Sequence, residues 1–465
     1  MQMKNHIKPK YHIKPKSGFL NDPNGLVQFK GVYHAFYQWL EEVKPQGPKS
    51  WAHCTSKDLV HWEDKGIALK PDMWYDKDGC YSGNTVVFNE KIYLFYTGNV
   101  RDENGDRETY QCLATSEDGK TFIKHGPVVY LPEGYTAHFR DPKVWRDEDE
   151  NLWYMIVGAQ TSEMKGNVAL FWSEDLLNWN YKGKLLPEAM NWGYMCECPD
   201  LIRFDDKYIL IISRQEKIIE NGIEKDSCNA IWISGEFSKE NGKFIPNGEE
   251  NRLDYGFDFY APQSFVDENK RTLYMAWMGG GEYDYQMSQP AVKEGWLHSF
   301  TYPRELIFKD NLLYQKPVKE LEVLRDKEIK ATIDNEVVDF SLDTLWNQFH
   351  VPSSYEFKFI LEEQKPFKCL ILGDLELDYD SNKKLLLIKR LNWITKEFDE
   401  KEMYIEEELK TVNIFIDNSS VEIFINEGKQ AMSIRAYFKE DNIKISSKGK
   451  LQLNLWSYKE ENNNE

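Results

Sequence analysis

The chain has 465 residues, of which 14% are aromatic and 41% hydrophobic, and its formal net charge is -19. This length and composition allow two domains with substantial cores. The charge argues against a nucleic acid or an anionic membrane surface as a partner. No run of about 18 apolar residues occurs, so no membrane-spanning helix is expected.

The seven cysteines have neither the spacing of a disulfide framework nor that of a zinc site. Cys196 and Cys198 form a Cys-x-Cys pair without a second cysteine pair or a histidine-rich partner, so we expect no metal and no cofactor. Residues 1–10 are positively charged but lack the apolar segment of a signal peptide. A reduced, cytoplasmic setting is therefore expected. The sequence leaves open whether the chain forms a homodimer.

An aromatic and apolar run recurs five times in the first part of the chain. The runs align on a shared tyrosine and comprise Tyr33–Trp39, Ile92–Gly98, Leu152–Gly158, Lys207–Ser213 and Thr272–Met278. Strand-rich units of such a period are typical of a β-propeller, here with five blades.

Chemically distinctive residues precede each run by a similar distance. Counting back from the five tyrosines reaches Asp22, Ser82, Asp141, Glu197 and the segment Tyr260–Ser264. We therefore expect all five positions to open the same strand of their blades, near the propeller axis.

A polar motif that ends in an aromatic residue supports the same repeat. It occurs as Ser56–Trp62, Ser116–Phe122 and Ser173–Trp179. Each copy is typical of a hairpin turn followed by an aromatic side chain that packs between blades. These motifs are therefore expected to be structural and not catalytic.

The pattern changes after Leu306. Residues 309–330 are charged, and Val318–Leu324 could form a short connecting helix. Alternating strands then follow at Tyr355–Ile360, Lys384–Lys389, Val412–Ile416, Ser420–Ile425, Met432–Ala436 and Leu451–Leu455. The sequence predicts an all-β protein with a five-bladed propeller at 1–310, a linker at 311–329 and a β-sandwich at 330–465.

Two carboxylates at equivalent strand positions could perform glycoside hydrolysis. Retaining hydrolysis needs a nucleophile and a protonated acid about 5 to 5.5 Å apart, and Asp22 and Glu197 could meet near the axis. Asp22 is then the candidate nucleophile. Taken alone, Asp22–Gly25 would be ordinary turn chemistry; its coincidence with Asp141 and Glu197 in the repeat favours a site.

The two remaining candidates need particular surroundings. Arg140 and Asp141 could form a structural ion pair, or one could point into the funnel while the other fixes the strand. Asp141 would then stabilise an oxocarbenium-like transition state. Glu197 must hold a proton, so neighbouring carboxylates and burial against Met195 and Trp192 are expected to raise its pKa.

The ordered motifs resemble glycoside hydrolase family 32, the β-fructosidases, over essentially the whole chain. They are Ser17–Gly25, Tyr33–Trp39, Trp51–Trp62, Tyr81–Thr85, His138–Trp145, Gly193–Asp200, Tyr260–Phe265, Trp296–Leu306 and Val412–Gly428. The resemblance implies a propeller followed by a β-sandwich, and enzymes acting on sucrose 6-phosphate are the most similar members.

The resemblance also implies a role for each site residue. Asp22 would be the nucleophile, Glu197 the acid/base and Asp141 the transition-state stabiliser, and Cys198 would influence the acid without being a nucleophile. The expected substrate-binding residues are Asn21, Gln38, Trp51, Tyr81, Ser82, Arg140 and Trp277.

The chain departs from the family pattern at Leu40–Glu42, Gln46, Ala52 and Cys196, which border the expected pocket. The expected reaction is hydrolysis of sucrose 6-phosphate to glucose 6-phosphate and fructose, and sucrose itself is expected to be a second substrate. The alternative is an invertase or exo-fructanase acting on unphosphorylated sugars. Lys49 and Arg214 are candidate cations for the phosphate group.

Overall fold

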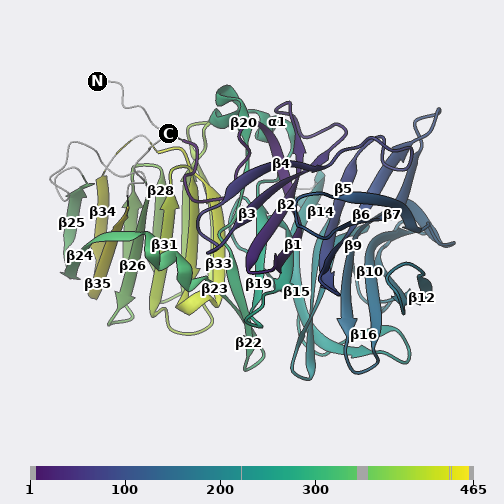
Figure 1. Cartoon of the computed structure of the whole chain (residues 1–465). Coiled ribbons are helices and arrows are strands. Elements are labelled where there is room, and N and C mark those ends of the chain that lie inside the picture. Colours follow the sequence, from purple (N-terminus) through teal and green to yellow (C-terminus); the bar gives the residue numbers. More distant parts are fainter. Residues whose placement is uncertain (1–6, 221–222, 343–353, 439, 441, 460–465) are drawn as a thin grey trace. The chain divides into compact units, whose positions relative to one another are not determined.

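The computed structural model describes residues 7–220, 223–342, 354–438, 440 and 442–459 (Figure 1). The chain divides into two compact units, described here one at a time. The propeller unit comprises Pro15–Leu253 and Tyr260–Trp277, and the sandwich unit comprises Met1–Lys14, Asp254–Phe259 and Met278–Glu465. None of the helices in the described ranges is long and apolar enough to cross a membrane.

Consecutive antiparallel strands build the propeller unit. The first two repeats contain β1 (Gly18–Phe29), β2 (Val32–Leu40), β3 (Ser50–Ser56), β4 (Glu63–Leu69), β5 (Cys80–Phe88), β6 (Lys91–Arg101), β7 (Arg107–Ser116) and β8 (Ile123–Val129). The next two contain β9 (Tyr135–Asp147), β10 (Leu152–Thr161), β11 (Gly166–Ser173), β12 (Asn180–Lys184), β13 (Met195–Phe204), β14 (Lys207–Glu220), β15 (Ile223–Ser238), β16 (Lys243–Pro246) and β17 (Asn251–Arg252). The fifth begins with the hairpin of β18 (Tyr260–Val266) and β19 (Thr272–Met278).

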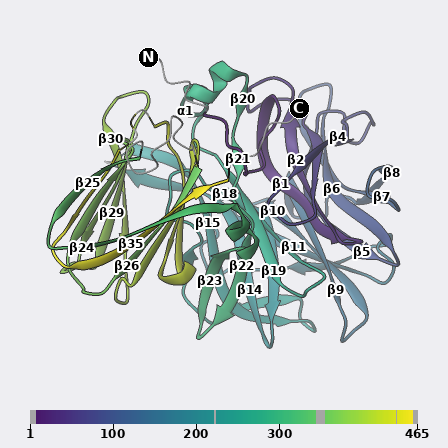
Figure 2. The same cartoon turned by 60° about the vertical axis from the view of Figure 1, so that its left-hand side comes forward.

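The first strands of the five repeats form a closed ring. β1 contacts β5, β5 contacts β9, β9 contacts β13, β13 contacts β18, and β18 returns to β1. Figure 2 labels β1, β5, β9 and β18 among these strands. This closure confirms the predicted five-bladed propeller. The five aromatic runs lie on the second strands β2, β6, β10, β14 and β19. These strands are buried on both faces, which explains their almost continuous apolar sequence.

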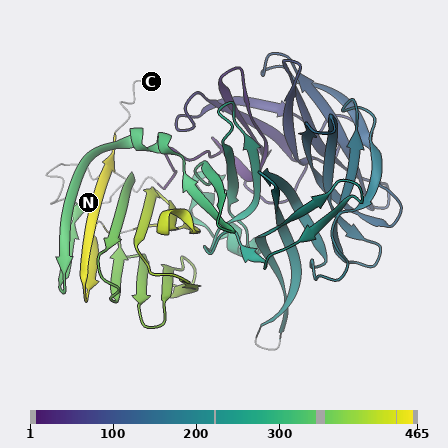
Figure 3. The ribbon, with the colours of Figure 1, turned by 90° about the horizontal axis from the view of Figure 1, so that it is seen from below.

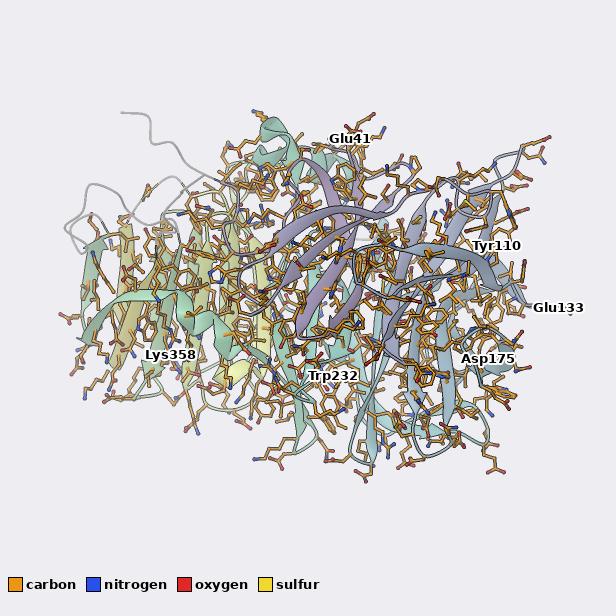
Figure 4. All side chains as sticks on the ribbon, in the orientation of Figure 1. Glu41, Tyr110, Glu133, Asp175, Trp232 and Lys358 are labelled. Atoms are coloured by element: carbon orange, nitrogen blue, oxygen red, sulfur yellow. The ribbon has the colours of Figure 1, made fainter. Side chains whose placement is uncertain are left out.

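The predicted turns are present. Asp175 Oδ1 accepts hydrogen bonds from the backbone N–H groups of Leu177 and Asn178 at 2.9 and 2.8 Å, and Figure 4 labels this aspartate. The aromatic residue that follows, Trp179, packs edge-on against Phe95 of the preceding blade. The motif therefore joins neighbouring blades, as predicted.

The sandwich unit contains two six-stranded sheets, ordered β24-β35-β26-β31-β32-β33 and β25-β34-β27-β28-β29-β30 (Figure 3). Their strands are β24 (Arg325–Asp334), β25 (Val337–Ser341), β26 (Ser354–Leu361), β27 (Phe367–Ile371), β28 (Leu375–Asp380), β29 (Leu385–Leu391), β30 (Phe398–Tyr404), β31 (Thr411–Asp417), β32 (Ser420–Ile425), β33 (Gln430–Arg435), β34 (Asn442–Ser447) and β35 (Lys450–Tyr458). The inward side chains of both sheets form one apolar core. The predicted sandwich is confirmed, whereas the domain boundaries at 310 and 330 stay a prediction.

Short elements precede the two sheets. They are α1 (Tyr283–Met287), the 3-10 helices η1 (Pro290–Glu294) and η2 (Lys319–Leu324), and the strands β20 (Trp296–Leu297), β21 (Ser299–Phe300), β22 (Arg304–Lys309) and β23 (Leu312–Pro317). A third 3-10 helix, η3 (Asn426–Gly428), follows β32. The short helix expected at Val318–Leu324 is thus present as η2.

Buried ion pairs hold the sandwich unit together. Arg304 is fully buried and donates from Nε and Nη2 to Glu422 at 2.9 and 2.5 Å. The other oxygen of Glu422 faces His12 Nε2 at 3.1 Å, and His12 Nδ1 lies 2.8 Å from Asp417. Because buried charges are costly unless they are paired, these contacts fix the N-terminal segment of this unit against β31 and β32.

Candidate active site

The first strand of each repeat contains a bulge at the candidate residues. The register with the second strand shifts in β1 at Asn21 and Asp22, in β5 at Ser82, in β9 at Asp141 and in β13 at Cys198. Asp141 and Cys198 have φ angles of 68° and 44°, a left-handed conformation that costs energy in non-glycine residues. Bulges redirect side chains, so each strand can aim its polar group at the axis.

Proline follows the bulged residue in β1, β9 and β13, as Pro23, Pro142 and Pro199. Proline cannot donate to a strand ladder, and within a sheet it is confined to edges and bulges. Asp22–Gly25 is thus part of β1 and does not form an isolated turn.

Asp22 is held through both carboxylate oxygens. Ser82 Oγ donates to Oδ2 at 2.5 Å and Gln38 Nε2 to the same oxygen at 3.3 Å, while Asn21 Nδ2 donates to Oδ1 at 3.1 Å. Gln38 also donates to Ser82. Burial raises the pKa of Asp22, although Lys49 and the Ser82 hydrogen bond oppose this rise. The hydrogen bonds therefore fix the orientation of the Asp22 carboxylate, and together with Lys49 they only partly offset the cost of burying its ionised form.

Asp141 is fixed by its own strained backbone. Its N–H donates to Thr97 Oγ1 at 2.9 Å, and its Oδ2 accepts the Cys198 N–H at 3.0 Å. Thr97 in turn donates to Gln111 Oε1 at 2.7 Å. Burial, reinforced by the nearby Glu197 carboxylate, raises the pKa of Asp141 to about 7.

Glu197 receives four hydrogen bonds. Arg140 donates to its Oε1 from Nε at 3.2 Å and from Nη2 at 2.6 Å. Its Oε2 accepts from Gln215 Nε2 and from the Tyr260 hydroxyl, each at 2.7 Å. Burial acts to raise the pKa of Glu197, but Arg140 and these hydrogen bonds outweigh it and leave the pKa below its ordinary value.

One expectation about Glu197 is corrected, and one alternative for Arg140 is decided. The expected rise in the pKa of Glu197 through burial against Met195 and Trp192 is wrong for the free protein, because Arg140 pairs with Glu197 directly. Of the two alternatives for Arg140 and Asp141, the ion pair is the one observed. The bulge begins at Asp141, and Arg140 Nε lies 3.9 Å from Asp141 Oδ2 while Nη2 pairs with Glu197.

The remaining predicted binding residues lie at different depths. Tyr81 is half-buried, and Lys49 Nζ lies 5.9 Å from the centre of its ring. Trp51 is fully buried, with its indole N–H donating to the Tyr81 carbonyl at 3.0 Å. Trp277 packs edge-on against Phe19. Trp51 thus supports the strand that carries Tyr81.

Sequence reasoning did not single out two partners of Glu197. Gln215 lies on β14 directly opposite Met195. Only the register between β13 and β14 could have indicated that it lies near Glu197. Tyr260 was placed in the repeat by its spacing but was given no role. Both side chains donate to the same carboxylate oxygen, which only the folded ladder reveals.

The raised pKa of Asp141 makes Asp141→Asn a stabilising substitution. An aspartic acid in an unfolded chain titrates near pH 4, whereas Asp141 keeps its proton to about pH 7. Folding therefore takes up a proton, and this group's contribution to stability falls as the pH rises through that window, by up to about 4 kcal/mol. We expect Asp141→Asn to raise the unfolding temperature, and to raise it more at pH 8 than at pH 5.

Thermal unfolding of both proteins at the two pH values measures this effect. Asp206→Asn, an exposed substitution in the turn after β13, is the matched control and should leave the unfolding temperature unchanged. A loss of stability on Asp141→Asn, or a gain that does not depend on pH, would contradict the assignment.

Comparisons with known proteins identify both parts of the chain. Residues 12–317 match the model of the glycosyl hydrolases family 32 N-terminal domain, and residues 320–459 match the family 32 C-terminal model. The sucrose-6-phosphate hydrolase of Bacillus subtilis (strain 168) is 40% identical over 459 residues, covering 96% of this chain and 92% of the relative. The raffinose invertase of Escherichia coli is 35% identical, covering 94% and 91%.

Solved structures agree with these matches. The sucrose-6-phosphate hydrolase of Lactobacillus gasseri superposes with a TM-score of 0.84 at 30% identity, covering 97% of this chain and 93% of that one. A GH32 β-fructofuranosidase of Bombyx mori gives 0.83 at 27% identity, covering 97% and 94%. The chain belongs to glycoside hydrolase family 32.

Proposed function

We propose that this protein is a retaining β-fructofuranosidase that hydrolyses sucrose 6-phosphate to glucose 6-phosphate and fructose. One observation carries the proposal: in a family 32 chain, two half-buried carboxylates are held in different ways, Asp22 mainly by neutral donors and Glu197 by an arginine. Relatives that bear the name sucrose-6-phosphate hydrolase support the choice of substrate.

Asp22 is proposed to attack the anomeric carbon of the fructosyl unit. Hydrogen bonds from Ser82, Gln38 and Asn21 hold the carboxylate in place, so little freedom is lost on reaching the transition state. The attack forms a covalent fructosyl ester, and water later cleaves this ester with retention of configuration.

Glu197 is proposed to protonate the leaving oxygen and then to deprotonate the attacking water. The productive state needs a proton on Glu197 while Asp22 and Asp141 are ionised. In the free protein the pKa values favour the opposite distribution, since that of Glu197 is lowered and that of Asp141 is raised. The three groups titrate as one coupled system. A sugar hydroxyl that takes over Arg140 donors would move the proton towards Glu197.

Asp141 is proposed to bind sugar hydroxyls and to stabilise positive charge at the anomeric centre. The left-handed backbone, the Thr97 contact and the Cys198 N–H fix its carboxylate before substrate arrives. Fixed, desolvated charge is worth more to a transition state than a mobile solvated one.

A cytoplasmic location is proposed with this substrate. All seven cysteines are free, and six are buried, which suits a reducing compartment. A phosphotransferase uptake system would deliver the sugar there already phosphorylated.

The proposed substrate is tested by kcat/KM on sucrose 6-phosphate, sucrose and kestose. A charge-assisted contact to the phosphate should make sucrose 6-phosphate the best substrate, by about tenfold or more over sucrose. Equal values for the two would replace the proposal with an invertase, and a preference for kestose would replace it with an exo-fructanase.

A further inference from the structure

Three basic side chains gather beside the candidate active site. Arg101 ends β6 and Arg107 begins β7, opposite each other in the ladder, and His138 lies on the neighbouring β9 (Figure 1). Arg107 Nη1 lies 3.3 Å from His138 Nδ1. Arg140 Nη1 lies at the same distance from that nitrogen. We call Arg101, Arg107 and His138 the basic corner.

The histidine of the basic corner is a neutral bridge with a free donor side. Arginine nitrogens only donate, so Nδ1 of His138 accepts from both guanidinium groups. Its Nε2 must then carry the hydrogen. Burial and the two nearby arginines lower the pKa of His138 to about 4, so the ring is neutral near pH 7. His138 is exposed, so that N–H can donate to a ligand.

The charge of Arg107 is not neutralised. Among the residues that the structure describes, no carboxylate lies within ion-pair distance of Arg107. Burial and repulsion from Arg140 lower its pKa. Other arginines are paired, such as Arg203 with Asp149 at 3.1 Å. In a chain with a formal charge of -19, a half-buried arginine without a carboxylate fits a site for an external anion.

The neighbours of Arg107 place it on the leaving-group side. The charged and titratable groups that act on it most are Arg140, Tyr81, Arg101 and Glu197. Glu197 is the group proposed to protonate the leaving oxygen. A substituent on the departing glucosyl unit would therefore pass close to the basic corner.

The two cations that the sequence suggested fit this role less well. Arg214 donates to both oxygens of Glu250 at 2.6 and 2.9 Å and also contacts Glu216, so its charge is already matched. Lys49 lies over the rings of Phe19 and Tyr81, and Asp22 is the charge that acts on it most. Lys49 therefore belongs with the nucleophile.

We propose that the basic corner binds the phosphate group of the substrate, with Arg107 as its main ligand. A phosphate monoester carries about two negative charges at neutral pH and three acceptor oxygens. The fork of Arg107, the Nε2–H of His138 and the charge of Arg101 provide matching donors. The inference rests on the proposed function, because it assigns the phosphate of sucrose 6-phosphate to this place.

The test compares Arg107→Gln with the wild type on sucrose 6-phosphate and sucrose. We expect kcat/KM on sucrose 6-phosphate, divided by that on sucrose, to fall about tenfold to a hundredfold, because the charge-assisted hydrogen bonds from the Arg107 guanidinium group to the phosphate are lost. Arg107→Lys, which keeps the charge but not the fork, should give an intermediate ratio. Lys120→Gln removes one exposed charge beyond the other end of β7 and should leave the ratio unchanged.

Inorganic phosphate separates failure of this site from failure of the proposed substrate. It should inhibit sucrose hydrolysis by the wild type, and Arg107→Gln should raise its inhibition constant at least tenfold. If the wild type prefers sucrose 6-phosphate and Arg107→Gln keeps that preference, the basic corner is not the site. If the wild type does not prefer sucrose 6-phosphate to sucrose, the proposed substrate is wrong. If Arg107→Gln leaves the inhibition constant of phosphate unchanged, the basic corner is not a phosphate site either.

Discussion

Asp22→Asn is expected to lower kcat on the preferred substrate by roughly four to six orders of magnitude, the size of loss seen when a covalent nucleophile is removed. The amide cannot form the fructosyl ester. The fold should survive, because burial already raises the pKa of Asp22 and the substitution removes a desolvated charge. Steady-state rates and thermal unfolding of both proteins measure the two parts of this prediction.

The control for Asp22→Asn is again Asp206→Asn, which removes an exposed charge in the turn between β13 and β14 and should keep full activity. Hydrolysis by the wild type in aqueous methanol adds a stereochemical readout. A double displacement through Asp22 yields the methyl β-fructofuranoside, whereas a single displacement by solvent yields the α anomer. Turnover by Asp22→Asn within tenfold of the wild type, or an α product, would refute the nucleophile assignment.

The propeller could be predicted because its second strands are buried on both faces. Such strands need near-continuous apolar sequence, as in Leu152–Gly158, and five copies at a regular period leave few other folds. The prediction of the sandwich strands was less complete. Strand β30 (Phe398–Tyr404) lies at the edge of its sheet and buries only Met403, so its charged sequence gave no strand signal.

The candidate site could be predicted in position but not in detail. Repeat spacing placed Asp22, Asp141 and Glu197 on equivalent strands, and all three lie on first strands of the ring. The bulges were not foreseeable, because a left-handed aspartate before proline has no distinct sequence pattern. The ladder is broken directly after Arg140, whose side chain pairs with Glu197.

The pairing of Arg140 with Glu197 connects the site to the basic corner. Arg140 contacts Glu197 through Nε and Nη2 and His138 through Nη1. A phosphate that draws on Arg107 and His138 would change the hydrogen bonds of Arg140 as well. The proposal therefore couples recognition of the leaving group to protonation of Glu197 through one guanidinium group.

Glu197→Ala is expected to lower kcat on sucrose 6-phosphate by about a hundredfold to ten-thousandfold, the usual contribution of a general acid. A 4-nitrophenyl β-fructofuranoside needs no proton on its leaving group, so its first step should remain fast and release a burst of nitrophenol. The second step should then be slow, because no base activates water. Stopped-flow absorbance separates the two steps.

Azide gives Glu197→Ala a positive readout. As an anionic nucleophile it needs no general base, so it should accelerate the second step and yield the β-fructosyl azide. Asp22→Asn should gain nothing of this kind, since it forms no ester. Glu224→Ala, an exposed substitution on β15, is the matched control and should behave as the wild type. A variant of Glu197 without a burst, or one that azide does not rescue, would mean that another group supplies the proton.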